Sequence, residues 1–159
     1  MTSIQKIVIL HASQSGTSEY LAGLLHEKLS SVVDYPVIFD SISNFENYID
    51  LDGKTLFLFV ISTSMEGSPP DAMVDFYDWM TTSKARSLFT NINFEYSVFG
   101  NGNSNYAETY QNASRTLKQT IGTCKIPLID CREGDQMDGT SEQTFEEWQS
   151  DIVEKLTSL

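Results

Sequence analysis

Cysteine, histidine and positive charge are all scarce in this 159-residue sequence. The two cysteines, Cys124 and Cys131, form no C-x-x-C pair, and the two histidines, His11 and His26, show no ligand spacing with them. Because four ligands in a metal-binding pattern are missing, we expect no metal site. We expect both thiols to be unpaired, as in proteins of a reducing compartment.

Long apolar runs are also missing. No stretch approaches the roughly 20 apolar residues that span a membrane, and residues 1–4 lack the pattern of a signal peptide. The length, together with the absence of repeats and linkers, predicts a single domain over residues 1–159. We expect a cytoplasmic monomer that binds no membrane.

Ten Lys and Arg residues stand against 22 Asp and Glu residues, so the net charge is −12. Such a surface repels phosphate backbones and anionic lipids, which argues against binding of nucleic acid. It favours a basic protein partner. Solubility alone is the alternative explanation of the charge.

Along the chain, continuous apolar runs alternate with segments in which apolar residues recur at helical intervals. The runs predict strands at residues 6–10, 36–39, 55–61, 94–99 and 125–128, and the helical spacing predicts helices at 17–31, 72–80, 107–121 and 141–156. A weaker helical turn is expected at 44–48, and Thr140 with Gln143 forms a capping-box pattern. This order predicts an α/β fold with a parallel sheet between two helical layers. Loops 13–18, 62–71 and 101–106 should meet at the carboxyl edge of that sheet.

The first of these loops, S-Q-S-G-T-S at residues 13–18, enters a helix directly after a strand. Its hydroxyl groups and unpaired backbone N–H groups meet at the positive end of the helix dipole, which suits a phosphate. It lacks both the lysine of a P-loop and the G-x-G-x-x-G of dinucleotide folds. A single phosphate monoester fits best, and a simple Ser/Thr-rich helix cap is the alternative.

Four segments in order resemble one protein family. Residues 7–19 are similar to the S-Q-T-G-T-A-E start of the FMN domains of diflavin reductases, which include nitric oxide synthase and the sulfite reductase flavoprotein. Residues 62–71, 98–106, and 133–135 with 145–148 resemble that family's later motifs. The resemblance implies a flavodoxin-like three-layer sandwich with a five-stranded parallel sheet of order 2-1-3-4-5.

The same resemblance implies FMN as cofactor and assigns its contacts. Five residues of the first loop would hold the phosphate: Ser13, Gln14, Ser15, Gly16 and Thr17. Residues of the second and third loops would contact the flavin ring, and Asp135 would lie nearby. The loop residues are Ser62, Thr63, Ser64, Gly100, Asn101, Gly102, Asn103 and Tyr106. Tyr106 is the expected stacking residue, because an aromatic face can cover the ring; capping of a helix start is its alternative.

The second loop departs from the family pattern. Ser64 stands where many relatives have an aromatic residue, and Met65 stands where a glycine is usual. A side chain disfavours the positive φ that glycine adopts. We therefore expect the one-electron-reduced flavin to be less stabilised here. Acidic residues near the flavin are expected to lower its potential and to steer a basic partner, unless they form an ordinary solvated face: Glu66, Asp71, Glu108, Asp135 and Asp138.

The predicted function is electron transfer through FMN, from a reductase to a protein acceptor, with no catalytic side chain. His11 is expected to be a packed or partly exposed neighbour of the first loop rather than a base. A stand-alone NAD(P)H:quinone oxidoreductase is the alternative. A phosphoacceptor module of the same topology is disfavoured, because it needs an acidic cluster where this chain has H-A-S at residues 11–13.

Overall fold

The computed structural model describes residues 3–13, 15–49, 53–63, 67–106 and 108–158. Within these residues the strands form one parallel sheet of order β2-β1-β3-β4-β5, which confirms the predicted class and strand order. The bounds of the strands are β1 Ile4–Ala12, β2 Val37–Ser41, β3 Lys54–Ser62, β4 Phe94–Gly102 and β5 Arg132–Asp135.

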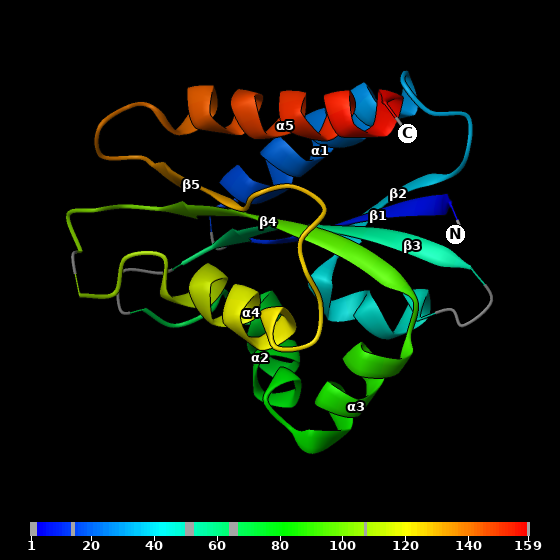
Figure 1. Cartoon of the computed structure of the whole chain (residues 1–159). Helices are drawn as coiled ribbons and strands as arrows, with labels where there is room; N and C mark the ends of the chain where they lie inside the picture. Colours follow the sequence, from blue (N-terminus) through cyan, green and yellow to red (C-terminus); the bar gives the residue numbers. More distant parts are fainter. Residues whose placement is uncertain (1–2, 14, 50–52, 64–66, 107, 159) are drawn as a thin grey trace.

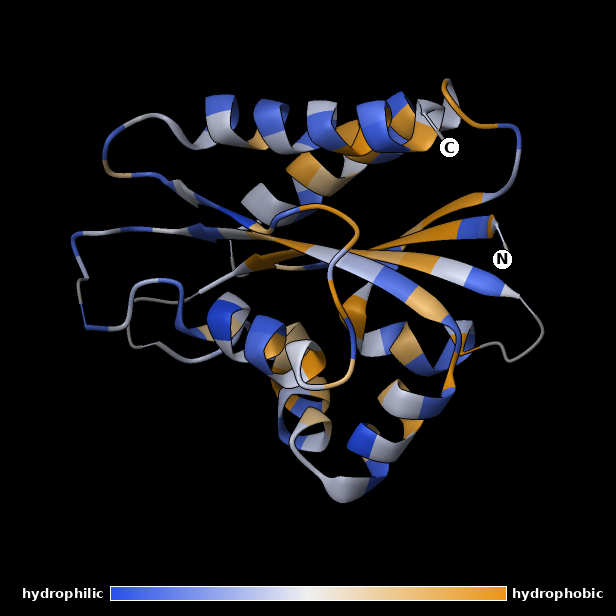
Figure 2. Ribbon diagram, in the orientation of Figure 1, coloured by the Kyte–Doolittle hydropathy of each residue, from blue (hydrophilic) through white to orange (hydrophobic). Residues whose placement is uncertain are grey.

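Helices cover both faces of the sheet (Figure 1). One face carries α1 (Thr17–Ser30) and α5 (Ser141–Thr157). The other carries α2 (Val74–Met80), α3 (Ser83–Asn91), α4 (Asn112–Gly122) and the 3-10 helix η1 (Ile42–Tyr48), with the short turn η2 (Asp71–Met73) before α2. Figure 2 shows apolar residues concentrated along the strands and on helix sides that face them.

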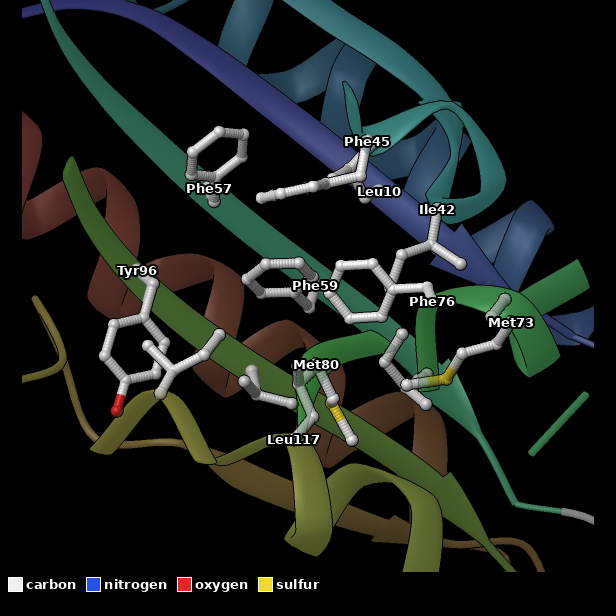
Figure 3. Packing of buried hydrophobic residues seen from close by; sticks show 14 of the residues in the cluster. Leu10, Ile42, Phe45, Phe57, Phe59, Met73, Phe76, Met80, Tyr96 and Leu117 are labelled. Atoms are coloured by element: carbon white, nitrogen blue, oxygen red, sulfur yellow. The ribbon is translucent and has the colours of Figure 1, made fainter. Parts of the chain in front are cut away.

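The two faces of the sheet bury separate cores. Along β1, Ile7 and Ile9 pack beneath α1 and α5, whereas Val8 and Leu10 pack with the other helices. The core beneath α2, α3, α4 and η1 is rich in aromatic rings (Figure 3). The ring centroids of Phe45 and Phe57, for example, are 5.3 Å apart. Burial on both faces explains why the central strands read as continuous apolar runs.

The fifth strand was predicted in the wrong place. Residues 125–128 are irregular, and the strand is the polar segment Arg132–Asp135, which pairs with β4 from Phe99 to Gly102. Pro127 has no N–H to give to a ladder, and Ile126 is 86% exposed. A strand at the sheet edge needs only backbone pairing, so its sequence carries little apolar signal.

Three helical predictions also need correction. Helix α3 was not predicted, although Thr82 caps it by accepting a hydrogen bond from Ala85 N. Helix α4 begins at Asn112 instead of residue 107, because the described residues before it form turns. The capping box at Thr140 is absent, since its hydroxyl donates to Asp138 rather than capping α5.

Both cysteines are unpaired, as predicted. None of the described helices combines the length and the apolar character that a membrane crossing needs. No group of three or more His, Cys, Asp or Glu side chains that could hold a metal ion occurs among the described residues.

Candidate functional site

The loops that follow β1, β3 and β4 meet at one edge of the sheet, as the sequence predicts. The turns after β4 and β5 lie at the left of Figure 1. The hydroxyls of Ser18 and Ser62 lie 2.5 Å apart and join the first loop to the second. Thr63 N donates to Asn101 O over 3.2 Å and joins the second loop to the end of β4.

The first loop leaves the start of α1 without a side-chain cap. Gly16 is the capping residue, and its φ of 89° lies in the left-handed region that glycine adopts at least cost. The hydroxyls of Ser15 and Thr17 lie 3.3 Å apart, and no side chain of the described residues accepts from the first N–H groups at this cap. Hydroxyl donors and uncapped N–H groups therefore stand together at the positive helix end, which fits a phosphate group rather than a simple cap. Ser13 directly follows β1, and Gln14 lies outside the described residues.

The second loop is tied to the start of α4. Thr63 Oγ1 accepts a hydrogen bond of 3.1 Å from Ala113 N. Asn112 Nδ2 donates over 2.8 Å to the carbonyl of Gly67. The hydroxyl of Thr63 thus has a structural partner within the protein. Ser64, Met65 and Glu66, with the expectations placed on them, lie outside the described residues.

The third loop presents one aromatic ring to solvent. Tyr106 is 40% exposed, and its N–H donates to Asn103 O over 3.1 Å. Asn103 Oδ1 accepts from Asn105 N, so this asparagine shapes the turn below the tyrosine. Asn101 is only 2% exposed, and its Oδ1 accepts from Ser141 Oγ over 2.8 Å. An open ring on a firmly bonded turn suits stacking against a planar ligand.

Asp135 fastens the third loop to the loop after β5. Its Oδ1 accepts from Ser104 N over 3.0 Å and from Met137 N over 2.9 Å. Hydrogen bonding by Ser104, through its hydroxyl and its N–H, lowers the pKa of the Asp135 carboxyl below its usual range. The carboxylate is therefore ionised at neutral pH and holds two loops together.

Gln111 is a structural residue that the sequence reasoning missed. It is fully buried before α4, and its Nε2 donates to the carbonyls of Gly100 and Gly134. A Cβ on Gly100 would collide with its amide oxygen, and one on Gly102 would lie 3.0 Å from its Cδ. Gly100 and Gly102 were the sequence signal for this buried side chain. A glycine can be required by a closely packed side chain as well as by a bound ligand.

His11 lies beneath the first loop as a packed neighbour, as expected. Its ring centroid is 5.0 Å from that of Phe39. Burial lowers the pKa of His11, although Glu19 and Asp40 act in the opposite direction. The His11 ring is tilted by 33° against the ring of Phe39 and packs below the loop.

A parallel sheet of order 2-1-3-4-5 with ligand-binding loops at its carboxyl edge is the architecture of the doubly wound class to which flavodoxins belong. The model of the family described as Flavodoxin matches residues 9–148. The chain belongs to the flavodoxin family, and FMN is its cofactor.

Similar proteins support the same family. The chain is 30% identical over 152 residues to NADPH–cytochrome P450 reductase of Candida tropicalis, with 94% of this chain and 22% of that protein covered. It is 28% identical over 158 residues to the NADPH sulfite reductase flavoprotein alpha-component of Shewanella oneidensis, with 98% and 24% covered. The chain thus spans less than a quarter of these two relatives.

The fold is also that of solved flavodoxins. A flavodoxin from Pseudomonas aeruginosa superimposes with a TM-score of 0.71 at 20% identity, covering 96% of this chain and 99% of its own. This chain is therefore a flavodoxin-like FMN domain for electron transfer, related to the FMN modules of diflavin reductases.

Proposed function

We propose that this domain receives electrons from a reductase and delivers them to a protein acceptor, with FMN held at the carboxyl edge of the sheet. The uncapped start of α1, with its hydroxyl groups, is the observation that carries the proposal. Bound FMN supplies the redox chemistry, and the protein binds and orients it.

The first loop would hold the phosphate with neutral donors. Hydroxyls of the first loop and backbone N–H groups from Gly16 onward would surround the phosphate oxygens; the proposed residues are Ser13, Gln14, Ser15, Gly16 and Thr17. The helix dipole offsets part of the phosphate charge, so the loop needs no lysine or arginine.

The second and third loops would hold the ring. Tyr106 would cover one face and exclude water from it, because its side chain is the open aromatic group of the third loop. The remaining proposed contacts are Ser62, Thr63, Ser64, Gly100, Asn101, Gly102, Asn103 and Asp135. Thr63 Oγ1 and Asn101 Oδ1 already accept hydrogen bonds within the protein, so the side chains of these two residues would meet the flavin as donors.

The proposed donor and acceptor are basic proteins. The net charge of −12 would attract them, and exposed carboxylates flank the candidate site at Asp71, Glu108 and Asp138. We further propose that residues 1–159 form a single domain that acts as a monomer in the cytoplasm, where the unpaired thiols remain reduced.

Two measurements on the purified protein test this function. Paired near-ultraviolet and blue absorption bands, retained after gel filtration, are expected for bound flavin. Reduction should then require an added reductase, and NADPH alone should not be oxidised. Steady NADPH oxidation by the protein by itself would instead support a self-sufficient oxidoreductase of the quinone-reducing type, and the absence of flavin binding would overturn the proposal.

A further inference from the structure

Gln111 is held in an unfavourable backbone conformation at the junction of the third loop and α4. Its φ is 58°, and no other described residue apart from glycine has a positive φ. A side chain disfavours this region, so it persists only where the surroundings hold the residue in place. The side chain of Gln111 is completely buried.

The amide of Gln111 joins the ends of two neighbouring strands. Its Nε2 donates over 3.1 Å to Gly100 O in β4 and over 2.9 Å to Gly134 O in β5. Its Oε1 accepts from Ser114 Oγ over 3.0 Å. Both N–H donors of the amide are therefore used, and they bridge β4 and β5 close to the ends of these paired strands.

The glycines of the third loop are matched to this amide. A Cβ on Gly100 would collide with Ser114 Oγ and Gln111 Oε1. A Cβ on Gly102 would lie 3.0 Å from both Cδ and Nε2 of Gln111. Both positions are packed tightly against this amide, whether or not a ligand is bound.

The strands that Gln111 joins lead directly into loops of the candidate site. β4 continues into the turn that carries Tyr106, and β5 ends at Asp135. Gln136 N donates to Gly102 O over 2.8 Å, so the two loops remain in contact beyond the amide. Gln111 therefore lies beneath this pair of loops, and Asp135 fastens them at the surface.

We propose that Gln111 is a positioning residue for the flavin ring: its amide holds the loops after β4 and β5 in place and thereby influences the affinity for flavin, without touching the flavin. The proposal rests on the FMN site described under the proposed function. Because the phosphate loop belongs to β1 and α1, this positioning acts on the ring and leaves the phosphate contacts unchanged.

The test compares Gln111→Met with the parent. Methionine keeps the length and flexibility of glutamine and removes both donors. Loss of these hydrogen bonds should raise the dissociation constants of FMN and of riboflavin alike by at least about fivefold. Gln119→Met, at an exposed position on the same helix, is the matched control and should change neither constant. Ile121→Val, in the buried face of α4, controls for a loss of stability without a change at the loops.

The outcomes separate the positioning role from a structural one and from the cofactor assignment. If Gln111→Met lowers the thermal midpoint but binds both flavins within about twofold of the parent, Gln111 is only structural and the proposal is overturned. A parent that binds no FMN overturns the cofactor site instead. If Gln111→Met does not fold, Ser114→Ala takes its place, because it removes the hydrogen bond to Gln111 Oε1: weaker binding of both flavins supports the proposal, and affinities within about twofold of the parent overturn it.

Discussion

At the scale of single residues, the proposed phosphate site depends on Ser15 and Thr17, whose hydroxyls lie 3.3 Å apart. Replacing both with alanine should remove charge-assisted hydrogen bonds to the phosphate, each worth about 1.5–3 kcal/mol. FMN binding should weaken by at least about tenfold, whereas riboflavin, which lacks the phosphate, should bind both proteins equally. Fluorescence titration with the two flavins measures this difference. If the double variant binds FMN with the affinity of the parent, the phosphate does not bind to this loop.

Tyr106 offers a second test at the same scale. Tyr106→Ala should lose stacking and burial of about 1–3 kcal/mol, because 40% of this residue is free to be covered by the ring. Tyr106→Phe keeps the aromatic face and should bind flavin almost as the parent does. Unchanged flavin fluorescence and affinity in the alanine variant would place Tyr106 outside the site.

Asp135 makes the third loop sensitive to acid. Hydrogen bonding by Ser104 lowers the pKa of this carboxyl in the folded protein. Its stabilising contribution is therefore complete above the unfolded value of about 3.9 and is lost as the pH falls through the folded value. Asp135→Ala should lower the urea midpoint at neutral pH, and the difference from the parent should shrink below about pH 4. Asp130→Ala, at an exposed position just before β5, is the control, and an Asp135 difference that does not vary with pH would contradict this role.

At the scale of elements, Thr63 connects β3 to α4 by accepting from Ala113 N over 3.1 Å. Thr63→Val has nearly the same shape but leaves this N–H without its acceptor, which should cost about 1–2 kcal/mol of stability. Thr63→Ser keeps the hydroxyl and should remain close to the parent. Urea denaturation of the flavin-free proteins measures both. If the valine variant is as stable as the serine variant, the hydroxyl does not stabilise α4.

Elements differ in how well the sequence predicts them. β3 has seven buried residues in a row, so burial on both faces left a clear apolar run. β5 is polar and lies at an edge, where backbone pairing with β4 is sufficient. The start of α4 is set by the left-handed Gln111, which only its buried partners hold in place. The position of β5 and the start of α4 are both set by contacts between segments that are distant in the sequence.

At the scale of the whole molecule, the charge of −12 should govern encounters with other proteins. Electron transfer from the reduced protein to a small basic haem protein should be fast at low ionic strength. It should slow by at least about tenfold between low salt and about 0.5 M salt, because screening shortens the reach of the charges. Stopped-flow measurements provide the rates, and an uncharged quinone acceptor is the control. A rate that does not change with salt would argue against electrostatic steering.

The sequence by itself determined the fold class and, through its family motifs, the strand order, and it predicted the first loop as a phosphate site. These properties depend on local patterns: apolar runs, helical spacing, and hydroxyl groups placed before a helix. Only the tertiary structure decided how the third loop is supported. Gln111 contacts Gly134, 23 residues away, and Asp135 contacts Ser104, 31 residues away. No local pattern specifies such pairs, because each residue acquires its role only when β4 and β5 lie side by side.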